Sequence, residues 1–248
     1  MNNKSFLITA VILASVTLFT FVRCKKQTQQ KVVADNHATL IEWHKEGMDA
    51  ALQLAKKENR PLFVYWGAQW CPPCNVVKAT VFTDNDFAIA TKKYIAVYLD
   101  GDTESAQQWG EKLNASGYPT LMVLSPEGSE VVRLSAEMSP KEFTEALNSV
   151  YDNLYPIHVL VKNILSTPVD KVDQKSWQIA ASYDWAQAKN NAEKINWAES
   201  YAQLENRIPA KFKREKDRLY VNAILAELGD LKEGTELPEA KRKTIADR

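Results

Sequence analysis

Residues 38–150 alternate between two kinds of hydrophobic pattern. From residue 38 to 59, apolar side chains recur at helical spacing and end in Lys56, Lys57 and Glu58, which predicts an amphipathic helix that stops before Pro61. A continuous apolar run typical of a strand buried on both faces occurs at 62–66, and further strands are predicted at 94–99, 120–124 and 130–134. Helical stretches separate or follow them, from Cys71 to 78 and at 85–93, 104–114 and 139–150. This order predicts an α/β fold with a mixed sheet covered by helices on both faces.

The pattern changes after residue 150, where no further strand is expected. Helical stretches are predicted at 156–165, 176–187, 192–207 and 210–228. Their tryptophans and tyrosines have the spacing of side chains that pack between helices. Residues 232–248 are highly charged and are expected to fray without a final packed element. The sequence thus predicts a first domain at 39–150 and an all-α C-terminal region at 151–248.

An apolar run from Phe6 to Val22 opens the chain, between Lys4 and the basic residues that follow it. Its length suits a signal peptide or a membrane anchor, which we assign to residues 1–23, followed by a polar linker at 24–38. Cys24 follows the run as a lipid-modified cysteine would, but Arg23 departs from the small residue that a bacterial lipobox requires. Cleavage, lipidation at Cys24 and an uncleaved anchor therefore remain alternatives. In each case the protein is expected to be exported to the periplasm or cell envelope, with a possible tether to the inner membrane.

Charge gives no indication of a nucleic-acid partner. Lys and Arg balance Asp and Glu, and the formal net charge is zero. A basic cluster at 211–218 is interleaved with Glu215 and Asp217, as on a solvated helix face. The hydrophobic content of 45% permits a sizeable core.

Two of the three cysteines lie in the stretch Trp70-Cys71-Pro72-Pro73-Cys74. A bridge between Cys71 and Cys74 closes a very small loop and adds little stability, so chemistry is the better reason for the pair. If a helix begins at Cys71, its free N–H groups and dipole favour the thiolate. Cys71 would then attack a disulfide, and Cys74 would resolve the mixed disulfide that forms. A structural disulfide and a zinc site remain alternatives, although the three histidines show no paired spacing and no second Cys-x-x-Cys occurs. No metal and no cofactor are expected.

Residues from about 39 to 150 resemble a thioredoxin-like domain. Trp70 to Cys74 matches its active-site motif, Tyr118-Pro119-Thr120 matches its cis-proline segment, and the stretch from Ala50 to Val64 is similar to the C-terminal domain of bacterial transmembrane disulfide reductases. The resemblance implies a thioredoxin-like mixed sheet and a cis peptide bond before Pro119, which would pack beside Cys71. It also implies substrate contacts by Trp70, Tyr118 and Pro119 around the redox-active disulfide of Cys71 and Cys74.

One departure concerns Tyr65, which stands where this family usually has a buried Asp or Glu, six residues before the first cysteine. The motif also lacks the His that makes such pairs more oxidising. We therefore predict a thiol–disulfide oxidoreductase that reduces protein disulfides and draws electrons from an unidentified upstream donor. An oxidase or isomerase would use the same site. A different alternative is an interaction or scaffold protein that binds a partner through its helical C-terminal region.

Overall fold

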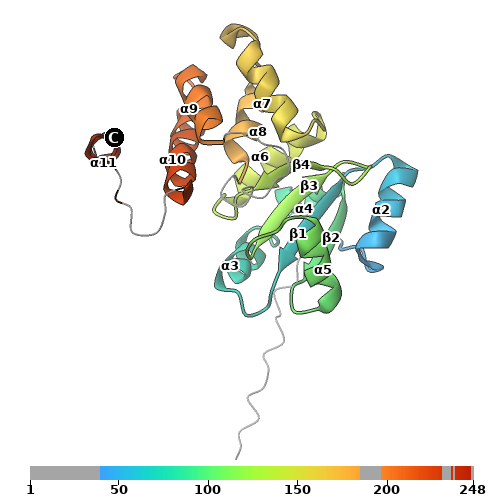
Figure 1. Ribbon diagram of the computed structural model, residues 1–248. Coiled ribbons are helices and arrows are strands. Elements are labelled where there is room, and N and C mark those ends of the chain that lie inside the picture. The colour runs from blue at the N-terminus through green and yellow to red at the C-terminus, as the bar shows by residue number, and fades with distance from the viewer. Residues whose placement is uncertain (1–39, 185–196, 231–235, 237, 247–248) are drawn as a thin grey trace, which may run out of the picture. The chain divides into compact units, whose positions relative to one another are not determined.

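The computed structural model describes residues 40–184, 197–230, 236 and 238–246 (Figure 1). The apolar run at 6–22, Cys24 and the polar linker lie outside these residues. Within the described ranges, no helix has both the length and the apolar character needed to cross a membrane.

A four-stranded mixed sheet forms the centre of the fold, in the order β2-β1-β3-β4. Strand β1 pairs in parallel with β2 and antiparallel with β3, and β3 pairs antiparallel with β4. The strands are β1 (Leu62–Gly67), β2 (Ile95–Asp100), β3 (Thr120–Leu124) and β4 (Glu130–Leu134). All six β1 residues are buried, as its continuous apolar run predicts. The predicted mixed sheet is confirmed.

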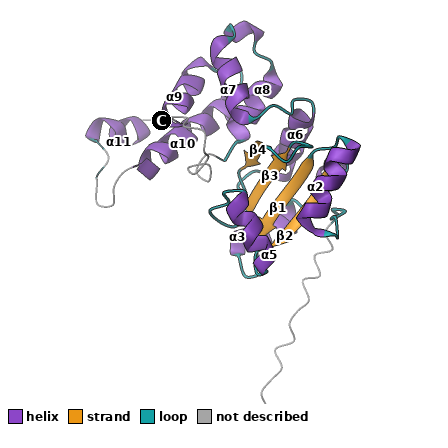
Figure 2. Cartoon of the chain, turned by 45° about the vertical axis from the view of Figure 1, so that its right-hand side comes forward, coloured by secondary structure: helices purple, strands orange, loops and turns teal. Residues whose placement is uncertain are grey.

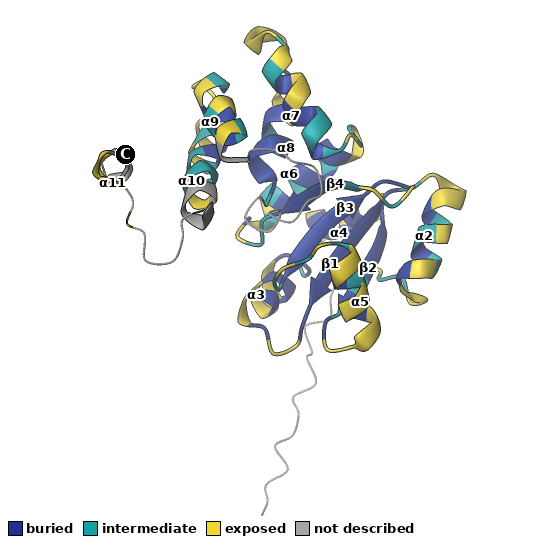
Figure 3. Ribbon diagram, viewed as in Figure 1, coloured by how far each residue is buried: buried dark blue, intermediate teal, exposed yellow. Residues whose placement is uncertain are grey.

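Helices cover both faces of this sheet (Figure 2). Because side chains of a strand alternate between faces, Phe63 and Tyr65 enter one hydrophobic core while Leu62, Val64 and Trp66 enter another. The first core includes residues of α3, α4 and α6, and the second includes residues of α2 and α5. The strands are accordingly buried along most of their length (Figure 3). The helices are α2 (Gly47–Glu58), α3 (Pro72–Thr80), α4 (Asn85–Thr91), α5 (Glu104–Lys112) and α6 (Pro140–Tyr151).

The helix predicted from residue 38 is shorter than expected, since α2 begins only at Gly47. The preceding segment instead follows the sheet. Trp43 forms an isolated parallel bridge with Ala96, and the His44 N–H donates to the Ala96 carbonyl at 2.7 Å. Trp43 also packs on the ring of Phe63. The spacing of Trp43 matched a helical period, but contacts with the sheet place this residue outside the helix. Such contacts cannot be predicted from the local sequence.

Helices make up most of the described residues of the C-terminal region. Its elements are α7 (Ile157–Ser166), the short 3-10 helix η1 (Val169–Lys171), α8 (Gln174–Ser182), α9 (Trp197–Arg207), α10 (Lys213–Asp230) and α11 (Glu239–Ala246). Helix α8 ends five residues before the predicted limit because Tyr183 forms an antiparallel bridge with Leu134 of β4. The prediction of a frayed end is wrong for residues 239–246, which form α11.

The first hydrophobic core continues from the sheet into the helices after α6. Trp177, Tyr201, Leu204 and Leu219 are fully buried in the same cluster as Phe63 and Tyr65. Burial of such large side chains contributes roughly 1.5–3 kcal/mol each. The C-terminal helices are therefore held by the core that also supports β1.

Candidate functional site

The cysteine pair lies at the start of α3, after the loop that follows β1. Cys71 is the N-cap residue of α3, with extended backbone angles of φ −79° and ψ 113°. Pro72 and Pro73 occupy the first turn, where a missing N–H group costs no helical hydrogen bond. The Cys71 Sγ accepts the backbone N–H of Cys74 at 3.2 Å, as an N-cap oxygen does in other helices. The expected start of a helix at this motif is confirmed.

Cys71 and Cys74 are joined by a disulfide, with their Cα atoms 5.2 Å apart. Cys71 is 3% exposed and Cys74 is fully buried. When the disulfide is reduced, the Cys74 N–H, which donates to the Cys71 sulfur, and the positive end of the α3 dipole favour a thiolate at Cys71. The more accessible sulfur therefore also has the more stabilising electrostatic environment.

Trp70 and Tyr118 are brought together although they are far apart in the sequence. Trp70 is 68% exposed, and its indole N–H donates to Asp102 Oδ1 at 2.8 Å. The ring of Trp70 meets the ring of Tyr118 edge-on, with centroids 5.7 Å apart. Tyr118 also lies against Trp66 of β1, at 4.1 Å between ring centroids. These contacts fix the loop before α3 beside the loop before β3.

The Tyr118–Pro119 peptide bond is cis, as expected. Thr120, the next residue, pairs with Trp66 in the sheet, so the cis-proline loop lies beside the strand that leads to Cys71. Pro119 and Pro73 line one groove with a volume of about 570 Å³. The predicted site residues are thus connected to one another by the disulfide, by the contact between Trp70 and Tyr118 and by adjacency in the sequence. Pro119 also shares the groove with Pro73.

Three further residues hold Tyr118 and Trp70 in place and were not singled out from the sequence. The Tyr118 hydroxyl donates to the Gly101 carbonyl at 3.1 Å and accepts a hydrogen bond from Gln107 Nε2. Asp102 holds Trp70. The dipeptide Asp100-Gly101 after a strand signals a turn, but only the fold shows that this turn faces the cysteine pair.

Tyr65 occupies the position at which the thioredoxin-like proteins that this sequence resembles usually have a buried Asp or Glu. Its side chain is 1% exposed and stacks on Tyr98 at 5.2 Å, with Phe82 edge-on at 4.9 Å between ring centroids. A Cβ at Gly67 would collide with the hydroxyl end of Tyr65, so glycine at that position makes room for the ring. An aromatic cluster therefore replaces a carboxylate at this position.

The described residues contain no group of three or more His, Cys, Asp or Glu side chains placed to hold a metal ion. Both sulfurs of the pair are bonded to each other. The geometry is that of a dithiol–disulfide couple.

Comparison with known proteins gives matches to the first half of the described chain. Residues 48–151 match the family model of a thioredoxin-like domain. A thiol:disulfide interchange protein, DsbD 1 of Pseudomonas aeruginosa, is 29% identical over 85 residues, which are 34% of this chain and 14% of that protein. A thioredoxin H-type of Oryza sativa subsp. indica is 29% identical over 99 residues, which are 40% of this chain and 76% of that protein.

Among solved structures, a thioredoxin from Thermus thermophilus is 25% identical with a TM-score of 0.40, and the match covers 44% of this chain and 86% of that one. The chain thus spans only a small part of the length of DsbD 1 and about three quarters of the plant thioredoxin. The matched residues end at 151, and the helices after α6 lie beyond the family match.

Proposed function

We propose that the protein is an exported thiol–disulfide oxidoreductase that reduces protein disulfides, and the proposal proceeds from the match of residues 48–151 to the family model of a thioredoxin-like domain. One observation carries the proposal: Cys71 is the N-cap of α3 and is disulfide-bonded to Cys74. A cysteine at a helix N-terminus is a better nucleophile at neutral pH because its thiolate is stabilised.

Reduction of a substrate proceeds in two exchange steps. The Cys71 thiolate attacks one sulfur of the substrate disulfide, a Cys71–substrate disulfide forms, and the other substrate sulfur leaves as a thiolate that takes up a proton. Cys74 then loses its proton and attacks Cys71, which releases the second substrate thiolate. The substrate gains two electrons, and the enzyme ends as the Cys71–Cys74 disulfide, the form present in the structure. An upstream dithiol donor must restore the reduced pair.

In this proposal Trp70, Tyr118 and Pro119 contact the substrate around the pair. Their support is the ring contact between Trp70 and Tyr118 and the groove shared by Pro119 and Pro73. The absence of His between the cysteines supports a reducing pair. The apolar run at 6–22 supports export to the periplasm or cell envelope, either after cleavage or with an anchor in the inner membrane.

Reduction of insulin by the purified protein, with dithiothreitol as donor, tests the activity. Cys71→Ser should abolish the reaction, whereas Cys74→Ser should accumulate a mixed disulfide because the second step is missing. Retained activity of Cys71→Ser would refute the mechanism. The measured redox potential of the pair decides between a reductase and an oxidase or isomerase, because these activities share the site and differ in potential.

A further inference from the structure

Helix α10 supplies one side of the groove that is also lined by Pro73, which lies between the two cysteines in the sequence. Pro73, Tyr118 and Pro119 line the groove from the matched domain, and α10 lines it with residues that lie beyond the family match. The α10 residues are Arg214, Asp217, Arg218, Val221, Asn222 and Leu225. A volume of about 570 Å³ is in the range of sites that bind small molecules or short peptide segments. A substrate that reaches Cys71 beside Pro119 would therefore also meet α10.

The α10 side of the groove has an exposed apolar pair. Val221 is 51% exposed and Leu225 is 47% exposed, and their spacing of four residues places them on one face of the helix. Leu219 is fully buried in the core, so α10 is apolar on a second face as well. A helix that is already anchored by its buried face leaves Val221 and Leu225 available to an apolar side chain of a substrate.

The charges around the groove favour a basic partner. Glu137, Asp184 and Asp217 line it, and each carries a carboxylate. The two arginines that also line it are paired with glutamates. Arg218 Nη2 lies 2.8 Å from Glu142 Oε1, and Arg214 Nη2 lies 2.9 Å from Glu145 Oε2 and 3.0 Å from Glu215 Oε1. Asp217 is itself ion-paired with Lys213 of the same helix, and Glu145 also lies 4.0 Å from Lys141 Nζ. The lining carboxylates and the glutamates paired with the arginines still outnumber these cations, so the local potential is negative.

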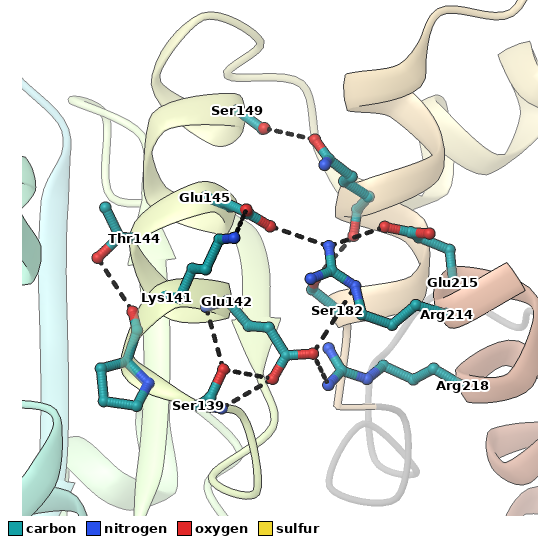
Figure 4. A network of polar contacts seen from close by, with 12 residues as sticks. Ser139, Lys141, Glu142, Thr144, Glu145, Ser149, Ser182, Arg214, Glu215 and Arg218 are labelled. Atoms are coloured by element: carbon teal, nitrogen blue, oxygen red, sulfur yellow. Dashed lines mark hydrogen bonds and ion pairs between the residues drawn. The ribbon is translucent and has the colours of Figure 1, made fainter. Parts of the chain in front are cut away.

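The same ion pairs hold α10 in position against α6. In Figure 4, Arg214 and Arg218 of α10 reach Glu142 and Glu145 of α6. Glu142 also accepts hydrogen bonds from the backbone N–H and hydroxyl of Ser139, both at 2.8 Å. Burial alone raises the pKa of Glu142, but the Ser139 hydrogen bonds and the charges of Arg218 and Arg214 outweigh it, so the pKa is lowered. The charged form of Glu142 thus supports the side of the groove that α10 provides.

From these observations we infer that α10 is a specificity element: it selects extended substrate segments in which the disulfide cysteine is flanked by an apolar residue and a basic residue. The apolar residue packs on Val221 and Leu225, and the basic residue faces Glu137, Asp184 and Asp217. This inference rests on the proposed function, because it assigns the substrate class of the same cysteine pair.

Three disulfide probes separate a failure of the α10 inference from a failure of the proposed function. The first is the symmetric disulfide of 2-nitro-5-thiobenzoate, which we call the small disulfide. The other two join 2-nitro-5-thiobenzoate to the cysteine of a peptide, in one case with Leu and Lys next to that cysteine and in the matched case with Leu and Glu. Attack by reduced Cys71 breaks the disulfide, joins the other sulfur to Cys71 and releases the coloured thiolate. For the wild-type protein, the Lys peptide should react roughly 5-fold faster than the Glu peptide at low salt, and the ratio should shrink in about 0.5 M salt.

Variants of the groove should lose this preference. Replacing Val221 and Leu225 by alanine should slow both peptides roughly 5-fold, because apolar contact is lost. Asp217→Asn combined with Glu137→Gln should bring the Lys and Glu peptides to nearly equal rates. Both double variants should still release thiolate from the small disulfide in a Cys71-dependent reaction, and dividing each peptide rate by this rate removes any change in the intrinsic reactivity of Cys71. Circular dichroism and thermal unfolding verify that the variants are folded.

Matched substitutions outside the groove provide the controls. Asp170→Asn removes an exposed carboxylate, and Val169→Ala shortens an exposed apolar side chain of η1. Both should react like the wild type with all three probes. Equal wild-type rates for the Lys and Glu peptides would overturn the role of α10, and so would unchanged peptide rates in the folded groove variants. In either case, a Cys71-dependent reaction of the small disulfide would still support the proposed function. A reduced wild-type protein that releases no thiolate from any probe would overturn the proposed function itself.

Discussion

Gly101→Ala should move Tyr118 away from the groove and slow disulfide exchange. A Cβ at Gly101 would lie within 2.5 Å of the ring atoms Cε1 and Cζ of Tyr118, closer than real Cβ contacts come. The ring has little room to retreat, because it lies against Trp66 at 4.1 Å and meets Trp70 at 5.7 Å between centroids. The substitution must therefore displace either the ring or the turn after β2.

The expected cost follows from overpacking of a filled site. Forced insertion of one methyl group typically destabilises a protein by about 1–3 kcal/mol. For a chain of this size, each kcal/mol lowers the melting temperature by about 2–4 °C. The hydrogen bond from the Tyr118 hydroxyl to the Gly101 carbonyl should also be lost or distorted. Because Tyr118 lines the groove, we expect the rate of insulin reduction to fall by about 10-fold, as small misplacements of positioning groups do.

The test measures the free energy of unfolding in urea and the exchange rate for two alanine variants. Gly117→Ala is the matched control: it adds the same methyl group next to Tyr118, but a Cβ at Gly117 meets no atom within 4 Å. That variant should change the unfolding free energy by less than about 1 kcal/mol. If Gly101→Ala is as stable and as active as Gly117→Ala, the packing argument for Tyr118 is wrong.

Two further predictions concern charges that hold the fold. Arg133 is 1% exposed, and its Nη2 lies 2.7 Å from Glu130 Oε2. Arg133→Met should destabilise the protein by about 3–5 kcal/mol in urea unfolding, because Glu130 loses its cationic partner and the Leu113 and Asn114 carbonyls lose their donors. The exposed control Lys171→Met should stay within about 0.5 kcal/mol, and equal effects of the two substitutions would contradict a stabilising role of the buried Arg133. The lowered pKa of Glu142 contributes stability that is present above its ordinary value of 4.5 and is lost as the pH falls through and below it. The Glu142→Gln variant should therefore lose less unfolding free energy between pH 6 and about pH 3.5 than the wild type does. If both proteins lose the same amount, the charge of Glu142 does not contribute to stability through its pair with Arg218.

Local patterns were sufficient for most elements of the sheet and for the start of α3. The apolar run at 62–66 became β1 because five consecutive apolar residues can be buried only where both faces of a strand are covered. Prolines at the first helical positions and a cysteine before them marked the beginning of α3. The limits of α2 and α8 were predicted less well, since Trp43 and Tyr183 form bridges with residues far away in the sequence.

The sequence by itself determined that the cysteine pair lies at a helix start, because the spacing of the cysteines, the prolines between them and the preceding strand are all local features. It also marked Pro119 for a cis bond through its resemblance to a known motif, which the structure confirms. Only the tertiary structure decided what surrounds the pair. Gly101 and Gln107 reach Tyr118 through the pairing of strands, and α10 reaches the groove through ion pairs with α6, more than sixty residues away. Such long-range contacts depend on how whole elements pack, and no periodicity along the chain encodes them.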